Sequence, residues 1–332
     1  MIPLQLLHGD YPAAISGETT PRTVGVHDIN TFAALTGDYS RIHLDDDYGA
    51  RLPYRGRIAH GLLSASWALG VLSLEAGLTV GRRNPWAWIS GFEANYRAPV
   101  RPGDTLHCRW RSTRHESAGN GFGAVRTEFQ VLTQTNDCAT DGHLLLALPI
   151  DAAARPPLAP PLPAWPERSF ESEPGRSYFL EDLYPGSLAG QTEGRTLTEA
   201  DVVGYGNFTG DYGVQHADAQ RAAAGLFGAR IVQPMLAFDV GFALWLREWS
   251  RVGPPEGAGA AGHLCDRWTF HSPFYIGDTL RCRFQTLTSR ASKSRPGVGL
   301  VTCGLQLLNQ RTEVAMSAEI VLMYPMRPAT AG

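Results

Sequence analysis

The chain has 332 residues and a formal net charge of −3, with 43% hydrophobic and 18% charged residues. This composition is typical of a globular protein long enough for two domains, and without a long basic run it argues against a nucleic-acid partner. No segment reaches the roughly 20 apolar residues of a membrane span, and residues 1–17 lack a signal-peptide pattern. We therefore expect a cytoplasmic protein with no membrane partner.

The cysteines are five in number, which is odd, and none forms a C-x-x-C pair. They predict reduced, mostly buried thiols, with neither a disulfide framework nor a metal site. These residues are Cys108, Cys138, Cys265, Cys282 and Cys303.

In chain order, residues 28–35 predict a short helix that ends at Gly37, a common C-terminal stop. The segment from Asp38 to His43 is then expected to be a loop. Residues 61–76 are apolar on nearly every side, which is typical of a buried helix. Alternating apolar residues at 106–110 and 125–131, and the apolar run at 143–150, predict strands.

Residues 196–218 repeat residues 23–45 in altered form, so that Asp211 and His216 each lie 173 positions after Asp38 and His43. A second apolar helix is expected at 235–246. We interpret this as a duplicated domain, with one repeat at 1–150 and the other at 177–332. The proline-rich residues 151–176 predict a semi-rigid linker. One buried helix on an antiparallel sheet in each repeat predicts an α+β fold.

Three motifs of the first repeat, in this order and spacing, resemble the MaoC-like family of (R)-specific enoyl-thioester hydratases and dehydratases. They read FAALTGD at 32–38 followed by HLD at 43–45, GRIAHG at 56–61, and RAPVRPGDTL at 97–106. The second repeat resembles the family more loosely. The resemblance implies a double hotdog fold, in which the two tandem repeats stand in for the two subunits of a dimer.

The resemblance also implies an activity. It is the reversible hydration of a trans-2-enoyl thioester to a (3R)-3-hydroxyacyl thioester, carried on coenzyme A or an acyl carrier protein. The resemblance implies no redox cofactor and no metal. Coenzyme A or phosphopantetheine would be part of the substrate. The family's catalytic residues correspond to Asp38, His43 and Gly61. The family commonly has Asn-Pro where this chain has Ser40 and Arg41.

The chemistry of these residue types suits that reaction. A helix that begins at Gly61 offers unpaired N–H groups to the thioester oxygen, while Asp38 and His43 exchange protons with one water. The sequence does not assign which of the two is the base. Further candidates for substrate contact, each with a purely structural alternative, are Ser40, Arg41, His60, Ser64 and Arg97.

The second repeat retains Asp211 and His216, but Gln233 and Pro234 replace His60 and Gly61. Because proline has no N–H to donate, we predict one working site and a vestigial or structural second dyad. The sequence leaves open whether the donor helix of a site comes from the other repeat.

Other functions remain open at this point. One is a dehydratase or cyclase for a single biosynthetic intermediate, which the Ser40-Arg41 departure favours. Others are an acyl-CoA thioesterase, against which the Asp-x-x-x-x-His pattern argues, and a non-catalytic acyl-binding protein. Assembly as a monomer or a homodimer is equally compatible with a fused pair of repeats.

Overall fold

The computed structural model describes residues 8–75, 87–119, 121–150, 165, 173, 176–252 and 262–328. The main elements of the first half are β1 (Ala14–Glu18), β2 (Arg22–Thr23), α1 (Val26–Thr36), α2 (Arg41–Leu44), α3 (Asp46–Arg51), α4 (Gly61–Glu75), β3 (Trp88–Tyr96), β4 (Thr105–Gly119), β5 (Phe122–Leu132) and β6 (Cys138–Pro149).

The second half repeats this order. Its main elements are β7 (Gly190–Gln191), β8 (Arg195–Thr196), α6 (Glu199–Thr209), α7 (Val214–Ala217), α8 (Ala219–Ala223), α9 (Pro234–Trp249), β9 (Gly262–Phe270), β10 (Thr279–Ala291), β11 (Val298–Leu308) and β12 (Val314–Pro325).

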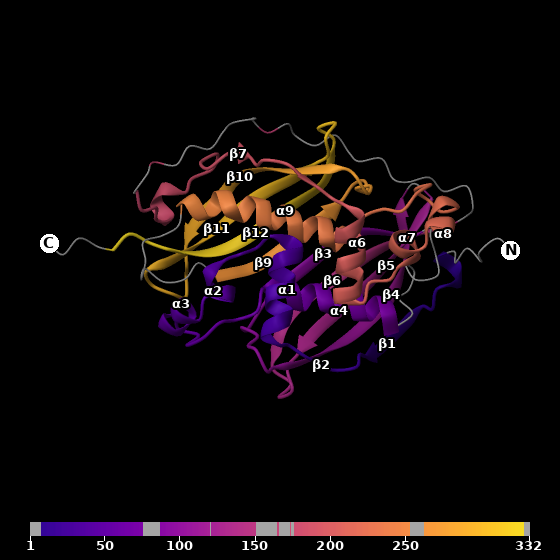
Figure 1. Cartoon of the computed structure of the whole chain (residues 1–332), viewed down its shortest axis with the longest axis horizontal. Helices are drawn as coiled ribbons and strands as arrows, with labels where there is room; N and C mark the ends of the chain where they lie inside the picture. The colour runs from indigo at the N-terminus through magenta and orange to yellow at the C-terminus, as the bar shows by residue number, and fades with distance from the viewer. Residues whose placement is uncertain are drawn as a thin grey trace.

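The strands form one antiparallel sheet in the order β1-β4-β5-β6-β3-β9-β12-β11-β10-β7 (Figure 1). The order reads the same from both ends, as expected for two copies related by an approximate twofold axis. The copies meet where β3 pairs with β9, and Phe92 lies opposite Trp268. The α+β arrangement of two helix-on-sheet repeats follows the expectation from sequence.

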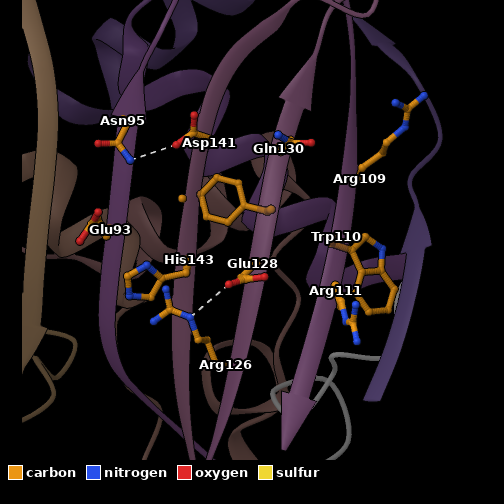
Figure 2. Close-up of a pocket in the computed structure, with 12 residues that line it drawn as sticks. Glu93, Asn95, Arg109, Trp110, Arg111, Arg126, Glu128, Gln130, Asp141 and His143 are labelled. Carbon is orange, nitrogen blue, oxygen red and sulfur yellow. Dashed lines mark hydrogen bonds and ion pairs between the residues drawn. The ribbon is translucent and has the colours of Figure 1, made fainter.

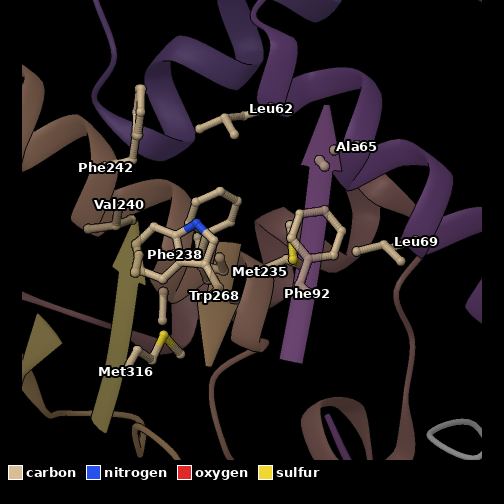
Figure 3. Packing of buried hydrophobic residues seen from close by; sticks show 14 of the residues in the cluster. Leu62, Ala65, Leu69, Phe92, Met235, Phe238, Val240, Phe242, Trp268 and Met316 are labelled. Carbon is tan, nitrogen blue, oxygen red and sulfur yellow. The ribbon is translucent and has the colours of Figure 1, made fainter. Parts of the chain in front are cut away.

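The two long helices, α4 and α9, pack on the sheet and against the shared core (Figure 1). Figure 3 shows side chains of both halves in contact across the β3–β9 junction. The Phe238 ring of α9 lies edge-on to the Trp268 ring, with centroids 4.2 Å apart. It is tilted against the Phe92 ring, with centroids 6.0 Å apart. Burying each such side chain stabilises the fold by about 1.5–3 kcal/mol, so the halves share one core.

Several expectations about local structure need correction. The predicted loop from Asp38 to His43 is wrong in its second part, because Arg41–Leu44 form the one-turn helix α2. The second long helix is longer than 235–246, since it runs from Pro234 to Trp249. Pro234 is tolerated in its first turn, where the missing N–H would have no partner in the helix. The proposed linker at 151–176 lies outside the described residues except for positions 165, 173 and 176.

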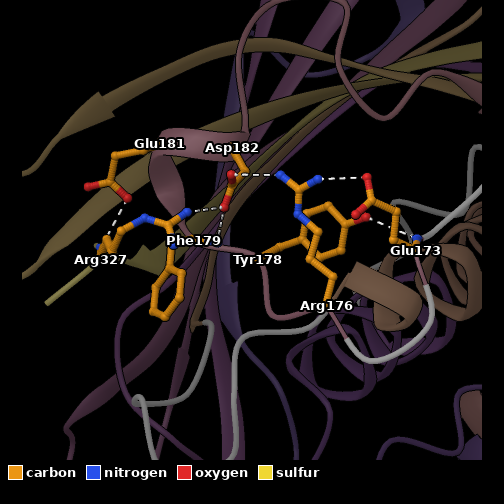
Figure 4. A network of polar contacts seen from close by, with 7 residues as sticks. All are labelled: Glu173, Arg176, Tyr178, Phe179, Glu181, Asp182 and Arg327. Atoms are coloured by element: carbon orange, nitrogen blue, oxygen red, sulfur yellow. Dashed lines mark hydrogen bonds and ion pairs between the residues drawn. The ribbon is translucent and has the colours of Figure 1, made fainter.

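The segment that follows the linker packs against the sheet of the second half. Leu180 lies on Gly299 of β11, where an added Cβ would come within 2.2 Å of it. Figure 4 shows how this segment is held: Arg176 and Arg327 both bind the Asp182 carboxylate, at 3.1 and 2.9 Å. Among the described helices none is long and apolar enough to cross a membrane.

A carboxyl group lies buried where the two central helices meet. Asp239 of α9 accepts hydrogen bonds from Ser66 and Tyr205, both at 2.9 Å to Oδ2, while Oδ1 has no partner among the described residues. Burial raises the pKa of Asp239 well above 3.8. The folded protein therefore holds a proton there that the unfolded chain releases at neutral pH.

We predict that Asp239→Asn raises the thermal unfolding midpoint at neutral pH. The amide keeps the hydrogen bonds without titrating, whereas the native carboxyl loses stability as pH rises above 3.8. Calorimetry from about pH 4 to pH 8 measures the difference, which should grow with pH. A variant that is less stable than the native protein at pH 8 would contradict this account.

Candidate active site

The Asp38 carboxylate is fixed by the turn that follows α1. Gly37 ends this helix in the left-handed region (φ 91°), and its N–H donates to the Ala33 carbonyl. Asp38 is 6% exposed, and its Oδ1 accepts from the Ser40 N–H at 3.1 Å and the Ser40 hydroxyl at 2.6 Å. Ser40, a candidate substrate contact, therefore orients Asp38 and leaves Oδ2 available.

The His43 imidazole is fixed in one tautomer. Its Nδ1 lies 2.9 Å from the Ile58 carbonyl, which only accepts, so Nδ1 carries the proton and Nε2 keeps a free lone pair. Asp38, His43 and His60 each present a side-chain atom within 4.8 Å of the others. The predicted acid–base residues are thus brought together.

His60 supports the other two residues. Its Nε2 donates to the Asp38 backbone carbonyl at 3.1 Å, and its ring lies on His43 with centroids 3.8 Å apart. Each imidazole already donates one N–H to a backbone carbonyl. These hydrogen bonds orient both rings beside the Asp38 carboxyl.

Burial and hydrogen bonding set the charge state. Burial alone would raise the pKa of Asp38, but the two imidazoles and the Ser40 hydrogen bonds outweigh it and lower that pKa. Burial lowers the pKa of His43 below 6.5, against the attraction of Asp38. Burial also lowers the pKa of His60, to about 3. At neutral pH the site holds a carboxylate and two neutral imidazoles.

Gly61 begins α4, so its N–H has no acceptor within the helix. An added Cβ at Gly61 would lie 2.7 Å from Cδ1 of Tyr96, so only glycine fits beside that ring. Because His60 contacts Asp38, this helix end belongs to the same half as the dyad.

The other half completes the surroundings of the dyad. Arg195 donates to the carbonyls of Leu35 and Thr36 at 2.9 Å each, and Arg247 to that of Gly37 at 3.3 Å. Two guanidinium groups of the second half thus hold the end of α1 directly before Asp38. Sequence reasoning missed both, because nothing local links these arginines to a helix in the other repeat.

The second dyad keeps part of this geometry. His216 Nδ1 lies 2.9 Å from the Ile231 carbonyl, as His43 does from Ile58. Asp211 accepts from the Ser73 hydroxyl at 3.2 Å, a contact across the halves. Pro234 is the first residue of α9, as Gly61 is of α4. The start of α9 therefore lacks the N–H group that Gly61 has, as expected from the sequence.

The remaining candidate contacts have structural partners. Ser64 donates to the Gly61 carbonyl at 2.7 Å and lies 3.0 Å from Thr140, which ties the start of α4 to β6. Arg41 pairs with Asp45 at 3.1 Å, and Arg97 with Asp141 at 2.6 Å. All three therefore hold the fold near the site.

A shallow groove of about 530 Å³ lies on the outer face of β3, β6, β5 and β4 (Figure 2). Asp141, which lines it, follows Thr140, whose side chain contacts α4, so the groove faces away from the dyad. Its charged residues are largely paired with one another or with neighbours, as in Arg126–Glu128. The groove is therefore separate from the buried dyad.

Comparison with known proteins decides the family. The family model described as MaoC like domain matches residues 13–133 and 184–305. This chain belongs to that family. The two segments of the MaoC-like chain correspond to the two halves of the structure.

Two curated relatives of this MaoC-like chain are enzymes by name. It is 36% identical over 92 residues to a 3-hydroxybutyryl-CoA dehydratase of Methylorubrum extorquens, covering 28% of this chain and 55% of that one. It is 34% identical over 85 residues to an (R)-specific enoyl-CoA hydratase of Rhodospirillum rubrum, covering 26% and 55%. The chain thus spans about half the length of the curated relatives it matches.

Solved structures confirm the double hotdog fold. A MaoC domain protein dehydratase from Chloroflexus aurantiacus superposes with a TM-score of 0.75 at 16% identity, covering 98% of this chain and 99% of that one. A Mycobacterium tuberculosis protein described as having a double hotdog fold superposes with a TM-score of 0.70 at 15% identity. The match covers 96% of this chain and 98% of that one. At these identities the likeness concerns the fold alone.

We predict that the His43 imidazole of this MaoC-like protein titrates with a midpoint below 6.5, and that Asp38→Asn lowers it further. Removing the carboxylate removes the attraction that favours the charged imidazole. NMR of the histidine Cε1 protons measures both midpoints. The matched variant Asp211→Asn should leave His43 unchanged, and a midpoint that rises in Asp38→Asn would refute the arrangement.

Proposed function

We propose that the protein catalyses the reversible hydration of a trans-2-enoyl thioester to a (3R)-3-hydroxyacyl thioester. The observation that carries the proposal is the tautomer lock on His43. With Nδ1–H donated to Ile58, Nε2 is free to accept a proton beside the free Oδ2 of Asp38. The names of the curated relatives support an acyl-CoA substrate, and an acyl carrier protein is the other carrier to test.

In the hydration direction, one water lies between Asp38 Oδ2 and His43 Nε2. His43 takes a proton from the water while Asp38 orients it, and the water oxygen bonds to C3 of the substrate. The electron pair of the C2–C3 double bond moves toward the thioester carbonyl. The proton on His43 then passes to C2 on the same face, which gives syn addition and returns the imidazole to its neutral form.

Negative charge develops on the thioester oxygen during this step. The Gly61 N–H at the start of α4 donates to that oxygen, and the positive end of the helix dipole adds to its stabilisation. Loss of one such donor costs on the order of 100-fold or more in rate. Since Pro234 cannot donate, only the first half supplies a complete site.

We expect Asp38→Asn and His43→Ala each to lower kcat/KM by roughly 100- to 10,000-fold, because each removes a proton-transfer group. The assay follows loss of the ultraviolet absorbance of (2E)-butenoyl-CoA on hydration. The matched variants Asp211→Asn and His216→Ala should keep kcat/KM within about 2-fold of the native value, less than the factor expected for any group that transfers a proton.

Loss of activity in Asp211→Asn as large as in Asp38→Asn would contradict the single-site account. Thermal unfolding of each variant, measured beside the kinetics, separates lost chemistry from lost folding. Repeating the assay with the same acyl group on an acyl carrier protein determines which carrier is preferred.

A further inference from the structure

A second polar cluster lies against the active site, at the junction of the two halves. Asp266 of β9 is 0% exposed, and both its oxygens are engaged. Oδ2 accepts from the Tyr96 hydroxyl and Oδ1 from His263 Nε2, each at 2.7 Å. A buried carboxylate loses its hydration at a cost of several kcal/mol, and apolar residues of similar volume are often at least as stable. Stability therefore gives little reason to retain these three residues.

A β-bulge brings the cluster together. His263 and Asp266 are three residues apart, so a regular strand would place them on opposite faces. The pairing of β9 with β12 shifts between Val321 and Leu322, which leaves Leu264 as an extra residue. The bulge thus turns His263 to the inner face with Asp266. Bulges of this kind re-aim side chains next to active sites.

The duplicated half provides an internal comparison. At the repeat offset of 174, the positions of His263, Asp266 and Tyr96 are occupied by Ile89, Phe92 and Phe270.

The first half carries the same bulge, because the pairing of β3 with β6 shifts between Ile89 and Gly91. Beside it, Gln215, the neighbour of His216, donates to the Ala87 carbonyl, so this end of β3 lies at the second dyad. Both halves therefore share the backbone bulge. At the matched positions, the polar residues Tyr96, His263 and Asp266 lie only beside the site that contains Gly61.

The imidazole of His263 is the member of the trio that can meet a ligand. Its ring packs against Tyr96 at 4.6 Å and Phe242 at 4.9 Å, and its side chain is 19% exposed. The Tyr96 ring in turn packs against Gly61, the first residue of α4. With Nε2–H donated to Asp266, Nδ1 has no hydrogen-bond partner within the described residues.

We propose that His263, held by Asp266 and Tyr96, selects acyl thioesters whose chain carries a hydroxyl group beyond C3. The proposal rests on the function proposed above. A hydroxyl donates to Nδ1, whereas an alkyl chain would leave that nitrogen desolvated and unpaired. An acidic substituent is disfavoured, because the Asp266 carboxylate lies directly behind the ring. His263 is thus a specificity-determining residue that the second half supplies to the first site.

The test uses matched pairs of (2E)-enoyl-CoA esters of four, five and six carbons, each with and without a terminal hydroxyl group. The native protein should prefer the hydroxylated member of at least one pair by about 10- to 100-fold in kcat/KM. The triple variant Tyr96→Phe, His263→Ile, Asp266→Phe installs the residues of the other half. It should lose the preference and still hydrate the plain esters.

Two further variants keep the test decisive. Asp266→Asn preserves the shape and should weaken the preference even if the triple variant fails to fold. Ile89→Leu, beside the second dyad, is the matched control and should leave the preference unchanged. Equal kcat/KM for both members of every pair in the native protein would overturn this proposal alone. No turnover of any ester would overturn the proposed function and this proposal with it.

Discussion

Antiparallel pairing of β3 with β9 joins two half-sheets that would otherwise each end in an exposed edge strand. The junction buries Phe92 and Trp268 around Phe238 of α9, so that neither half keeps a core of its own. The same junction brings Asp266 to the hydroxyl of Tyr96. Fold and active site therefore depend on one interface, and the second half is required even where its own dyad has lost the N–H donor.

Because the domain is duplicated, the two sites can be compared within one chain. The contact from the histidine to a carbonyl 15 residues later is retained in both, at His43 and at His216. What differs is the surroundings, since Gly61 is matched by Pro234. The aspartate–histidine pair and the loop that carries it are therefore common to both halves, whereas the glycine that begins the helix is present in the first half only. In the second dyad His216 is buried and Asp211 accepts a hydrogen bond from Ser73 of the first half.

Much of this arrangement was predictable from sequence, because it is written in local patterns. The repeat offset, the glycine stop at Gly37 and the apolar faces of α4 and α9 indicated the α+β double repeat, and the resemblance to a family pointed to Asp38 and His43. The roles of Ser40 and His60 needed coordinates, since both act through hydrogen bonds that spacing does not fix. His263 and Asp266 were missed because a β-bulge determines which face of the sheet each residue occupies. No pattern in the sequence indicates that bulge.

The most direct test is a crystal structure of the Asp38→Asn variant with (2E)-butenoyl-CoA bound. The account predicts one thioester per chain, with its carbonyl oxygen at the Gly61 N–H and C3 facing His43. A thioester at Pro234, or one at the first site with its carbonyl directed away from the start of α4, would contradict it.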